Sequence, residues 1–123
     1  MIMLDIDFFK KINDTHGHLV GDDVLVLMCN LIKNSIRESD YLIRWGGEEF
    51  IILTPEIDLD AAVKLAEKLR ILIEKNEFIA VGSITISLSV VQKNDDELLE
   101  NLLKRLDNLL YDSKRSGRNK TSF

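Results

Sequence analysis

Residues 44–50 read Arg44-Trp45-Gly46-Gly47-Glu48-Glu49-Phe50, and the rest of the chain is best interpreted outward from this stretch. Apolar runs at residues 41–43 and 50–53 flank it. Two short strand-like runs around a glycine pair predict a β-hairpin. Two adjacent acidic side chains stand at its tip, where the glycines leave the backbone uncovered, so a ligand or metal ion could approach closely.

Composition limits the classes of protein to which the chain can belong. Its 123 residues suit one domain, and a 46% hydrophobic, 30% charged composition is typical of a globular protein. A net charge of −5 disfavours nucleic-acid binding, which needs a basic face. The single cysteine, Cys29, indicates a reduced, cytoplasmic setting. No apolar run approaches the roughly 20 residues that cross a bilayer, so we expect no membrane segment.

The first part of the chain predicts a strand, a loop and a helix. Residues 1–6 form a largely apolar run that ends near Asp5 and Asp7, as in a buried strand with acidic residues at its carboxyl end. Residues 8–21 are rich in turn formers and predict an irregular or one-turn segment. Asp22 then begins a predicted helix that runs to about residue 36, because acidic side chains suit the positive end of a helix.

The middle of the chain predicts a second helix and a strand. Apolar residues recur at helical spacing between residues 59 and 73, and the helix would begin at Asp58 or Asp60. Residues 83–90 alternate strictly between polar and apolar side chains. That alternation is the clearest strand pattern in the chain.

The last part predicts a third helix and a tail. Asn94 and Glu97 have the spacing of a capping box, and a stripe of leucines follows between residues 99 and 110. We interpret the stripe as core packing, because it is too short for a coiled coil. Gly117 suits the end of this helix, and residues 118–123 are expected to form a tail.

The order of these elements, β-α-β-β-α-β-α, predicts an α+β fold. Its first six elements match the ferredoxin-like βαββαβ arrangement, with the third helix added at the C-terminal end. The two crossover helices would cover one face of the sheet. The third helix can cover only part of the other face, so we expect a partner or a further segment to pack there.

In that topology the hairpin tip lies close to the end of the first strand. We therefore expect Asp5 and Asp7 to lie near Glu48 and Glu49. Converging carboxylates repel one another unless a cation lies between them, and hard oxygen ligands suit Mg²⁺ or Mn²⁺. The residues alone leave two interpretations open: a metal-dependent nucleotide site, or acidic strand ends exposed to water.

Five motifs, taken together, resemble those of the GGDEF family of diguanylate cyclases, in which GGEEF is a common variant. They occur in family order and spacing across nearly the whole chain. In chain order they are Leu4-Asp5-Ile6-Asp7-Phe8-Phe9-Lys10-Lys11-Ile12-Asn13-Asp14, Gly17-His18, Gly21-Asp22, the Arg44–Phe50 stretch, and Tyr111-x-x-Lys114-x-x-Gly117-Arg118-Asn119. The resemblance implies a palm of the kind found in nucleotidyl cyclases and polymerases.

The resemblance implies that the acidic residues form the catalytic and metal site. Asp5, Glu48 and the main-chain carbonyl of Ile6 would bind Mg²⁺ or Mn²⁺. Glu49 would assist at the metal or help to activate the attacking hydroxyl group.

It also implies a GTP site. Asn13 and Asp22 would recognise guanine, because a carboxylate can accept hydrogen bonds from two adjacent guanine N–H groups. The other groups implied at the substrate are the triphosphate-binding Lys10, Lys114 and Arg118, the main-chain N–H groups around Phe8 and Phe9, and the glycines Gly46 and Gly47. Taken alone, Lys114 and Arg118 would be interpreted as cations at the negative end of the third helix. Taken alone, Asn13 would be a turn residue and Asp22 a helix cap.

The reaction implied is the condensation of two GTP molecules into cyclic di-GMP, with release of pyrophosphate, across a homodimer. Arg37 and Asp40 resemble the family's RxxD site, where product docks and inhibits; alone they would be an ordinary surface ion pair. Two alternatives remain: a catalytically weak or inactive module that binds GTP or cyclic di-GMP, and a related palm enzyme with another nucleotide product.

The match departs from the family in two places. The helical segment that precedes the first strand in the family is absent, so we expect residues 1–123 to be a single, N-terminally truncated catalytic domain or an unusually short one. In the family Arg44 pairs with an acid of that segment, which leaves its partner here open. Ser89 stands where the family has glycine. A sensory or regulatory domain is expected in the full protein.

Overall fold

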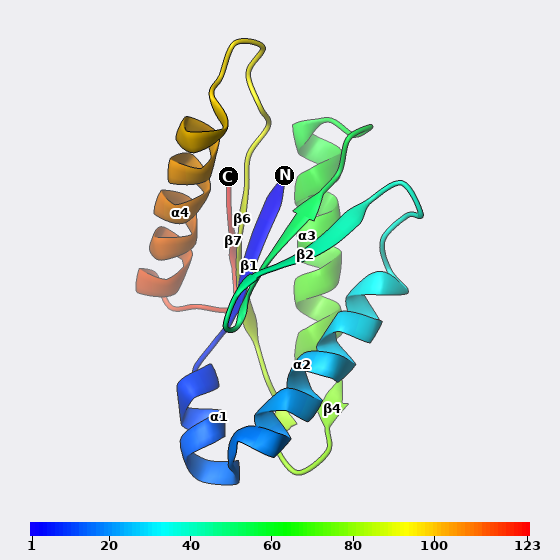
Figure 1. Cartoon of the computed structure of the whole chain (residues 1–123), viewed down its shortest axis with the longest axis vertical. Helices are drawn as coiled ribbons and strands as arrows, with labels where there is room; N and C mark the ends of the chain where they lie inside the picture. The colour runs from blue at the N-terminus through cyan, green and yellow to red at the C-terminus, as the bar shows by residue number, and fades with distance from the viewer.

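The computed structural model describes all 123 residues. Its helices and strands, in chain order, are β1 (Ile2–Ile6), α1 (Phe9–His16), α2 (His18–Lys33), β2 (Tyr41–Gly46), β3 (Glu49–Leu53), α3 (Leu59–Lys75), β4 (Glu77–Phe78), β5 (Gly82–Ser83), β6 (Ile86–Val90), α4 (Leu99–Arg115) and β7 (Thr121–Ser122). Five strands form one sheet in the order β2-β3-β1-β6-β7, while β4 and β5 form a separate small hairpin (Figure 1).

The central strand of the sheet is β1, which is buried along its whole length. It pairs antiparallel with β3 on one side and with β6 on the other. The order β2-β3-β1-β6 with a helix crossing after β1 and after β3 is the ferredoxin-like arrangement predicted from the sequence. The predicted α+β palm with an added C-terminal helix is therefore confirmed.

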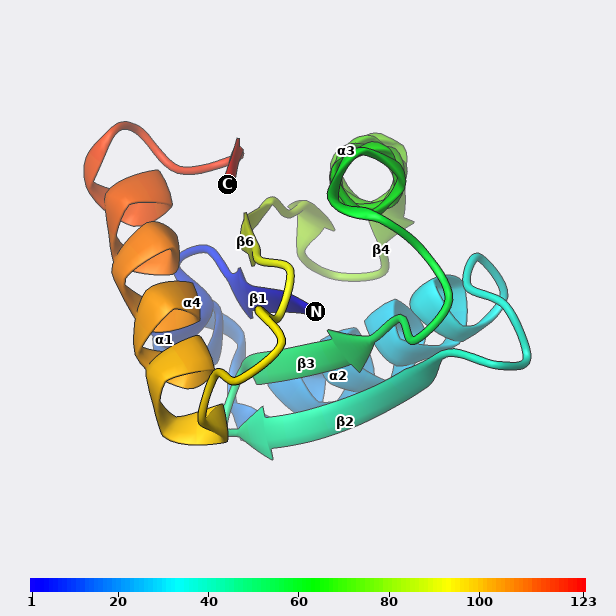
Figure 2. The same cartoon turned by 90° about the horizontal axis from the view of Figure 1, so that it is seen from above.

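Helices cover both faces of the sheet (Figure 2). The larger core lies between the sheet and α2 and α3, and it includes Ile2, Leu4 and Met28. A smaller core joins α4 to the opposite face through Met3 and Leu106. The leucine stripe thus packs in the core, as predicted.

The polar side chains that alternate in residues 83–90 do not all face water, because Ser87 and Ser89 are completely buried. The β-strand itself is also shorter and begins at Ile86. Helix α4 and the C-terminal segment cover this side, and Ser113 on α4 donates a hydrogen bond to the carbonyl of Leu88 at 2.8 Å. Small hydroxyl side chains allow this close approach of helix and strand.

The predicted loop at residues 8–21 is also wrong. It forms α1 and the first turn of α2, so Asp22 lies within α2 and does not begin it. Phe9 and Ile12 are buried against the core, and this packing outweighs the turn-forming composition. Gly17, at φ +88°, separates the two helices.

Two predictions for the last part of the chain are corrected. Glu97 accepts a hydrogen bond from the Asn94 N–H at 3.1 Å, but this closes an isolated turn, and α4 begins at Leu99. The expected tail contains β7, which pairs parallel with β6. Gly117 follows the end of α4 at φ +118°, in agreement with its predicted role.

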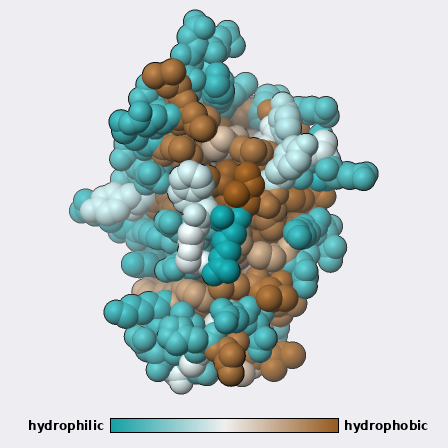
Figure 3. Space-filling view, in the orientation of Figure 1, coloured by the Kyte–Doolittle hydropathy of each residue, from teal (hydrophilic) through white to brown (hydrophobic).

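Part of the sheet surface next to α4 carries exposed apolar side chains. On β2, Tyr41, Ile43 and Trp45 are exposed by 60%, 40% and 53%. Hydrophobic surface is visible on this side of the molecule in Figure 3. This agrees with the expectation that α4 covers only part of the face. No helix combines the length and the apolar character that crossing a bilayer would require.

Candidate active site

The tip of the β2–β3 hairpin is held by Arg44. Its Nε and Nη2 atoms donate hydrogen bonds of 2.9 and 2.8 Å to the carbonyl oxygen of Gly47, which has a positive φ of +41°. The pairing shifts register between Arg44 and Gly46. Arg44 therefore has a partner within its own hairpin. A Cβ atom at Gly46 or Gly47 would meet no atom within 4 Å, so the space beside both glycines is open.

The hairpin brings two predicted catalytic acids to the end of β1. Asp5 lies directly opposite Glu49 in the β1–β3 pairing. Glu48 occupies the turn next to it, and the charges of both glutamates add to the rise that burial causes in the pKa of Asp5. Ile6, the predicted main-chain ligand, follows Asp5 at the end of the same strand. Figure 1 shows this strand end beneath the hairpin tip and beside the C-terminal end of α4.

Lys114 on α4 reaches the same place. Its Nζ lies 2.6 Å from Asp5 Oδ2. Burial nevertheless raises the pKa of Asp5 to about 6, with Glu48 and Glu49 adding to the rise and Lys114 opposing it. A buried carboxylate with acidic neighbours is unstable without added positive charge, and Lys114 supplies part of that charge.

The donor set fits a divalent cation. Asp5, Glu48 and Glu49 offer hard oxygen atoms at one strand end, and burial, with a smaller contribution from the two glutamates, raises the pKa of Asp5 there. The side chains are not gathered as a finished ligand cluster, since no three acidic, histidine or cysteine side chains lie close enough to hold an ion. Mg²⁺ needs only one or two carboxylates when phosphate and water complete its shell.

Asp7 does not belong to this group, contrary to the expectation from the sequence. Its two carboxylate oxygens accept hydrogen bonds from Thr85, Ser87 and the main-chain N–H of Asn119. Residues two apart on a continuous strand would share a face, but β1 ends at Ile6, so the chain changes direction between Asp5 and Asp7. Asp7 is therefore a buried structural acid.

Of the predicted triphosphate residues, Arg118 lies against Phe8, whereas Lys114 contacts Asp5. The guanidinium of Arg118 lies over the Phe8 ring, 4.5 Å from its centroid. Phe8 is exposed and has a left-handed backbone, whereas the Phe9 side chain is buried. Lys10 is exposed on α1. Phe9 begins α1, where the first N–H groups of a helix have no helical partners.

The predicted guanine residues lie between α1 and α2. The Oδ1 atom of Asn13 is buried without a hydrogen-bond partner. It rests against the backbone of Gly21, where a Cβ atom would overlap it. Asp22 follows Gly21 on α2 and is exposed. The structure thus places Asn13 and Asp22 near each other, with an unused acceptor on Asn13.

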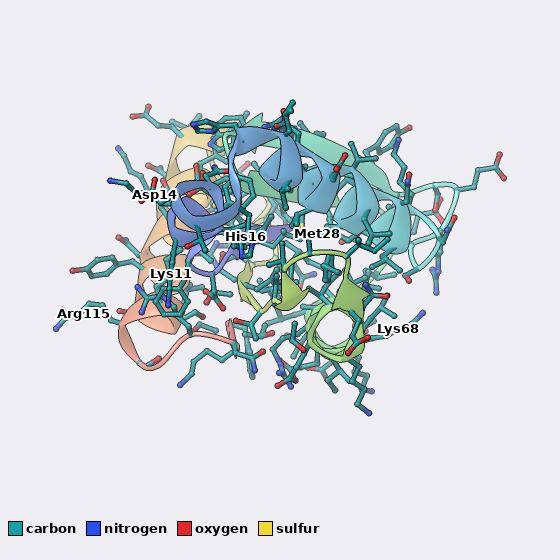
Figure 4. All side chains as sticks on the ribbon, turned by 90° about the horizontal axis from the view of Figure 1, so that it is seen from below. Lys11, Asp14, His16, Met28, Lys68 and Arg115 are labelled. Atoms are coloured by element: carbon teal, nitrogen blue, oxygen red, sulfur yellow. The ribbon has the colours of Figure 1, made fainter.

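The two predicted product-site residues form a separate turn between α2 and β2. Asp40 Oδ2 accepts from the Arg37 N–H at 3.0 Å, and the Asp40 N–H donates to the Arg37 carbonyl. They border a cavity of about 300 Å³ that Lys68 of α3 also lines. Figure 4 shows Lys68 well separated from the α1 side chains Lys11 and His16. The six residues of β2, roughly 20 Å of chain, separate this turn from the hairpin tip.

Comparisons with known proteins agree with this arrangement. Residues 1–120 match the family described as "Diguanylate cyclase, GGDEF domain". The chain belongs to the GGDEF family.

Diguanylate cyclase DgcM of Escherichia coli is 38% identical to this GGDEF domain over 98% of the chain, which spans 29% of DgcM. The crystal structure of the diguanylate cyclase SiaD in complex with its activator SiaC, from Pseudomonas aeruginosa, matches with a TM-score of 0.93 at 39% identity, over 99% of this chain and 48% of that one. The crystal structure of the GGDEF domain of DgcB from Caulobacter crescentus, in complex with c-di-GMP, matches with a TM-score of 0.90 at 30% identity. The match covers 98% of this chain and 74% of that one.

Sequence reasoning missed three features of this GGDEF domain. The direct ion pair of Lys114 with Asp5 joins residues from opposite ends of the chain, and no local pattern signals it. The Asp7–Asn119 hydrogen bond was missed for the same reason, although both residues lie within the family motifs. The contact between Asn13 and Gly21 carried a weak signal, since a glycine within a helical sequence often marks close packing.

Proposed function

We propose that this GGDEF domain is a diguanylate cyclase that condenses two GTP molecules into cyclic di-GMP and releases two pyrophosphates. The 3′-hydroxyl oxygen of one GTP attacks the α-phosphorus of the other, and the bond to the β-phosphate breaks. The observation that carries the proposal is the position of Asp5 opposite Glu49, next to the open Gly46–Gly47 turn. Family membership and the named relatives support it.

The acidic residues would hold Mg²⁺ or Mn²⁺, and Asp5, Glu48 and the Ile6 carbonyl are the proposed ligands. When bound, the metal neutralises charge on the phosphate and lowers the cost of ionising the hydroxyl group. Glu49 lies across the strand pair from Asp5 and would help to accept the proton of that hydroxyl.

The basic residues would orient the triphosphate. Lys114 now makes a charge-assisted contact with the Asp5 carboxylate, and it would make a contact of the same kind with phosphate when the nucleotide binds. Arg118 would contact phosphate from above Phe8, with Lys10 and the first N–H groups of α1.

Asn13 and Asp22 would recognise guanine. Asn13 is only partly buried, and its side-chain amide, whose Oδ1 has no partner within the chain, would turn to accept from a base N–H group. Asp22 offers a carboxylate that can accept from the two adjacent N–H groups of guanine, which adenine lacks. This arrangement favours GTP over ATP.

Catalysis would need two copies of the chain. The product has two-fold symmetry, and each chain would hold one GTP, so the two sites must face each other about a two-fold axis. The exposed hairpin tip is compatible with such an approach.

Product would bind a second time at the turn formed by Arg37 and Asp40. Arginine can fork onto phosphate or guanine, and aspartate can accept from guanine. The cavity of about 300 Å³ beside the turn, also lined by Lys68, supports binding there. The chain spans 29% of DgcM, and a sensory or regulatory domain in the full protein would control the enzyme.

The decisive experiment is an assay of the purified chain with GTP and Mg²⁺ or Mn²⁺ across a wide range of protein concentrations. Cyclic di-GMP, measured by chromatography, should form at a rate that rises more steeply than the protein concentration. A chain that binds GTP but makes no product at any concentration would instead be a GTP- or cyclic di-GMP-binding regulatory module. The Lys114–Asp5 ion pair, which occupies a proposed metal ligand, is the observation that favours this second candidate.

A further inference from the structure

Asp7 is a buried acid that the proposed chemistry does not use. It is 4% exposed, and its oxygens accept from Thr85 Oγ1 at 2.7 Å, Ser87 Oγ at 2.7 Å and the Asn119 N–H at 3.0 Å. Burying a charge costs free energy unless hydrogen bonds satisfy it, and here three donors do so. Two of them come from the neighbouring strand region, while the third comes from the turn after α4.

The turn after α4 has an uncommon backbone. Arg118 and Asn119 both lie in the left-handed region, at φ +63° and +46°. Asparagine tolerates this conformation, but for arginine it is strained. Such a conformation persists only where surrounding contacts over-determine it.

The side chain of Asn119 provides those contacts. Its Oδ1 accepts from Arg70 Nη1 at 2.8 Å, and its Nδ2 donates to Glu74 Oε1 at 2.8 Å. Arg70 also pairs with Glu67 and Glu74 on the same helix. Asn119 is therefore tied to α3 through its side chain and to Asp7 through its backbone.

These ties control where Arg118 points. Its N–H is bound to the Ser113 carbonyl at 3.0 Å, and its guanidinium lies over the ring of Phe8. Phe8 is itself left-handed, at φ +58°, and directly follows Asp7 in the chain. Asp7 is thus the chain neighbour of Phe8 on one side of the proposed triphosphate site. On the other side it accepts a hydrogen bond from Asn119, the chain neighbour of Arg118.

We propose that Asp7 and the Arg70–Glu74–Asn119 cluster are positioning residues that hold Arg118 and the Phe8 backbone in register for the β- and γ-phosphates of the nucleotide. The inference rests on the proposed function, because it assumes that Arg118 contacts the triphosphate. None of these four residues touches the nucleotide. They act by removing the freedom of the Arg118 side chain before the nucleotide arrives.

The test compares two nucleotides in variants that leave Arg118 in place. The variants are Asn119→Gly, which keeps the left-handed backbone accessible but loses both side-chain bonds, and Arg70→Met, which keeps the aliphatic length and loses the tie to Asn119. Glu67→Gln is the matched control, because it alters a partner of Arg70 that does not contact Asn119. The probes are α,β-methylene GTP, which carries the whole triphosphate and cannot react, and GMP, which lacks the β- and γ-phosphates. Calorimetry with Mg²⁺ measures both affinities, and circular dichroism checks folding.

The expected result is a loss of about tenfold in affinity for α,β-methylene GTP in Asn119→Gly and Arg70→Met, with GMP affinity within about twofold of wild type. Glu67→Gln should bind both nucleotides as wild type does. Unchanged affinity for the triphosphate analogue in the two variants would overturn the inference, and so would an equal loss for GMP, which indicates general loosening. A wild-type chain that binds neither nucleotide would overturn the proposed function itself.

Discussion

Lys114 Nζ and Asp5 Oδ2 lie 2.6 Å apart, so a cation from the last helix directly contacts an acid of the first strand. The pair joins a proposed phosphate ligand to a proposed metal ligand. In the chain without nucleotide, the lysine partly stabilises a carboxylate that burial and two glutamates destabilise. When nucleotide and metal bind, phosphate would take the place of Asp5 as the partner of Lys114, and the metal would take the place of Lys114 as the partner of Asp5.

Replacement of this lysine should therefore affect both proton binding and nucleotide binding. In Lys114→Met the pKa of Asp5 should rise further above about 6, because Lys114 is what lowers it. The pKa can be measured by carbon-detected NMR titration of the metal-free chain. Affinity for α,β-methylene GTP should fall about tenfold, as for loss of a charge-assisted hydrogen bond. A variant with a lower Asp5 pKa would contradict this account.

The raised pKa of Asp5 predicts a pH-dependent stability. Between about pH 4 and pH 6 the folded chain keeps a proton on Asp5 that the unfolded chain, with a pKa of 3.8, has released. The free energy of unfolding contributed by this group therefore falls as the pH rises through that window, and the cost remains at neutral pH.

Asp5→Asn removes that cost. In EDTA at about pH 7 the variant should melt at a higher temperature than wild type, and the two should converge near pH 3.5. Added Mn²⁺ should raise the melting temperature of wild type but not of the variant, because the variant lacks a proposed ligand. Thermal denaturation by circular dichroism measures both effects. A variant that melts lower than wild type at neutral pH would show that the ion pair with Lys114 outweighs the burial cost.

Gly21→Ala should impair guanine binding with little effect on folding. The added methyl group would overlap Asn13 Oδ1, which can rotate away, while alanine favours the helix by roughly 0.8–1 kcal/mol. GMP affinity should fall about tenfold, since Asn13 is displaced. Titrations of Gly21→Ala, Asn13→Ala and the double variant form a cycle. The double variant should be no worse than Asn13→Ala; fully additive losses would show that Gly21 acts independently of Asn13.

Arg44→Lys should slow the reaction without unfolding the chain. Lysine keeps the charge but cannot reproduce the two hydrogen bonds from one side chain to the Gly47 carbonyl. A looser hairpin tip would misplace Glu48 and Glu49, and the rate should fall about ten- to a hundredfold. Steady-state kinetics and a melting curve check the two parts. Full activity in the variant would mean that the hairpin tip is held by other contacts.

Arg37→Ala should weaken inhibition by product. Loss of an arginine contact to phosphate or guanine should raise the concentration of cyclic di-GMP needed for half-inhibition about ten- to a hundredfold. The measurement is the initial rate with increasing added cyclic di-GMP. Lys64→Ala, an exposed change on α3 outside the cavity lining, is the control. Equal inhibition of wild type and Arg37→Ala would refute binding at this turn.

Strong local patterns in the sequence predicted much of the fold. The hairpin around Gly46 and Gly47 and the leucine stripe of α4 are confirmed, because each depends on residues close together in the chain. The region of α1 was mispredicted, since its turn formers are outweighed by the burial of Phe9 and Ile12 against distant parts of the chain. β7 was missed because two residues carry no periodicity.

The sequence by itself determined the type of fold, the acidic hairpin tip and the family, because hydrophobic periodicity and motifs depend on residues close together in the chain. The tertiary structure decided which groups surround each acid. It placed Asp5 opposite Glu49 and against Lys114, and it turned Asp7 toward Ser87 and Asn119. Two acids only two residues apart thus have different surroundings, since the chain leaves the strand between them and different distant elements close around each one.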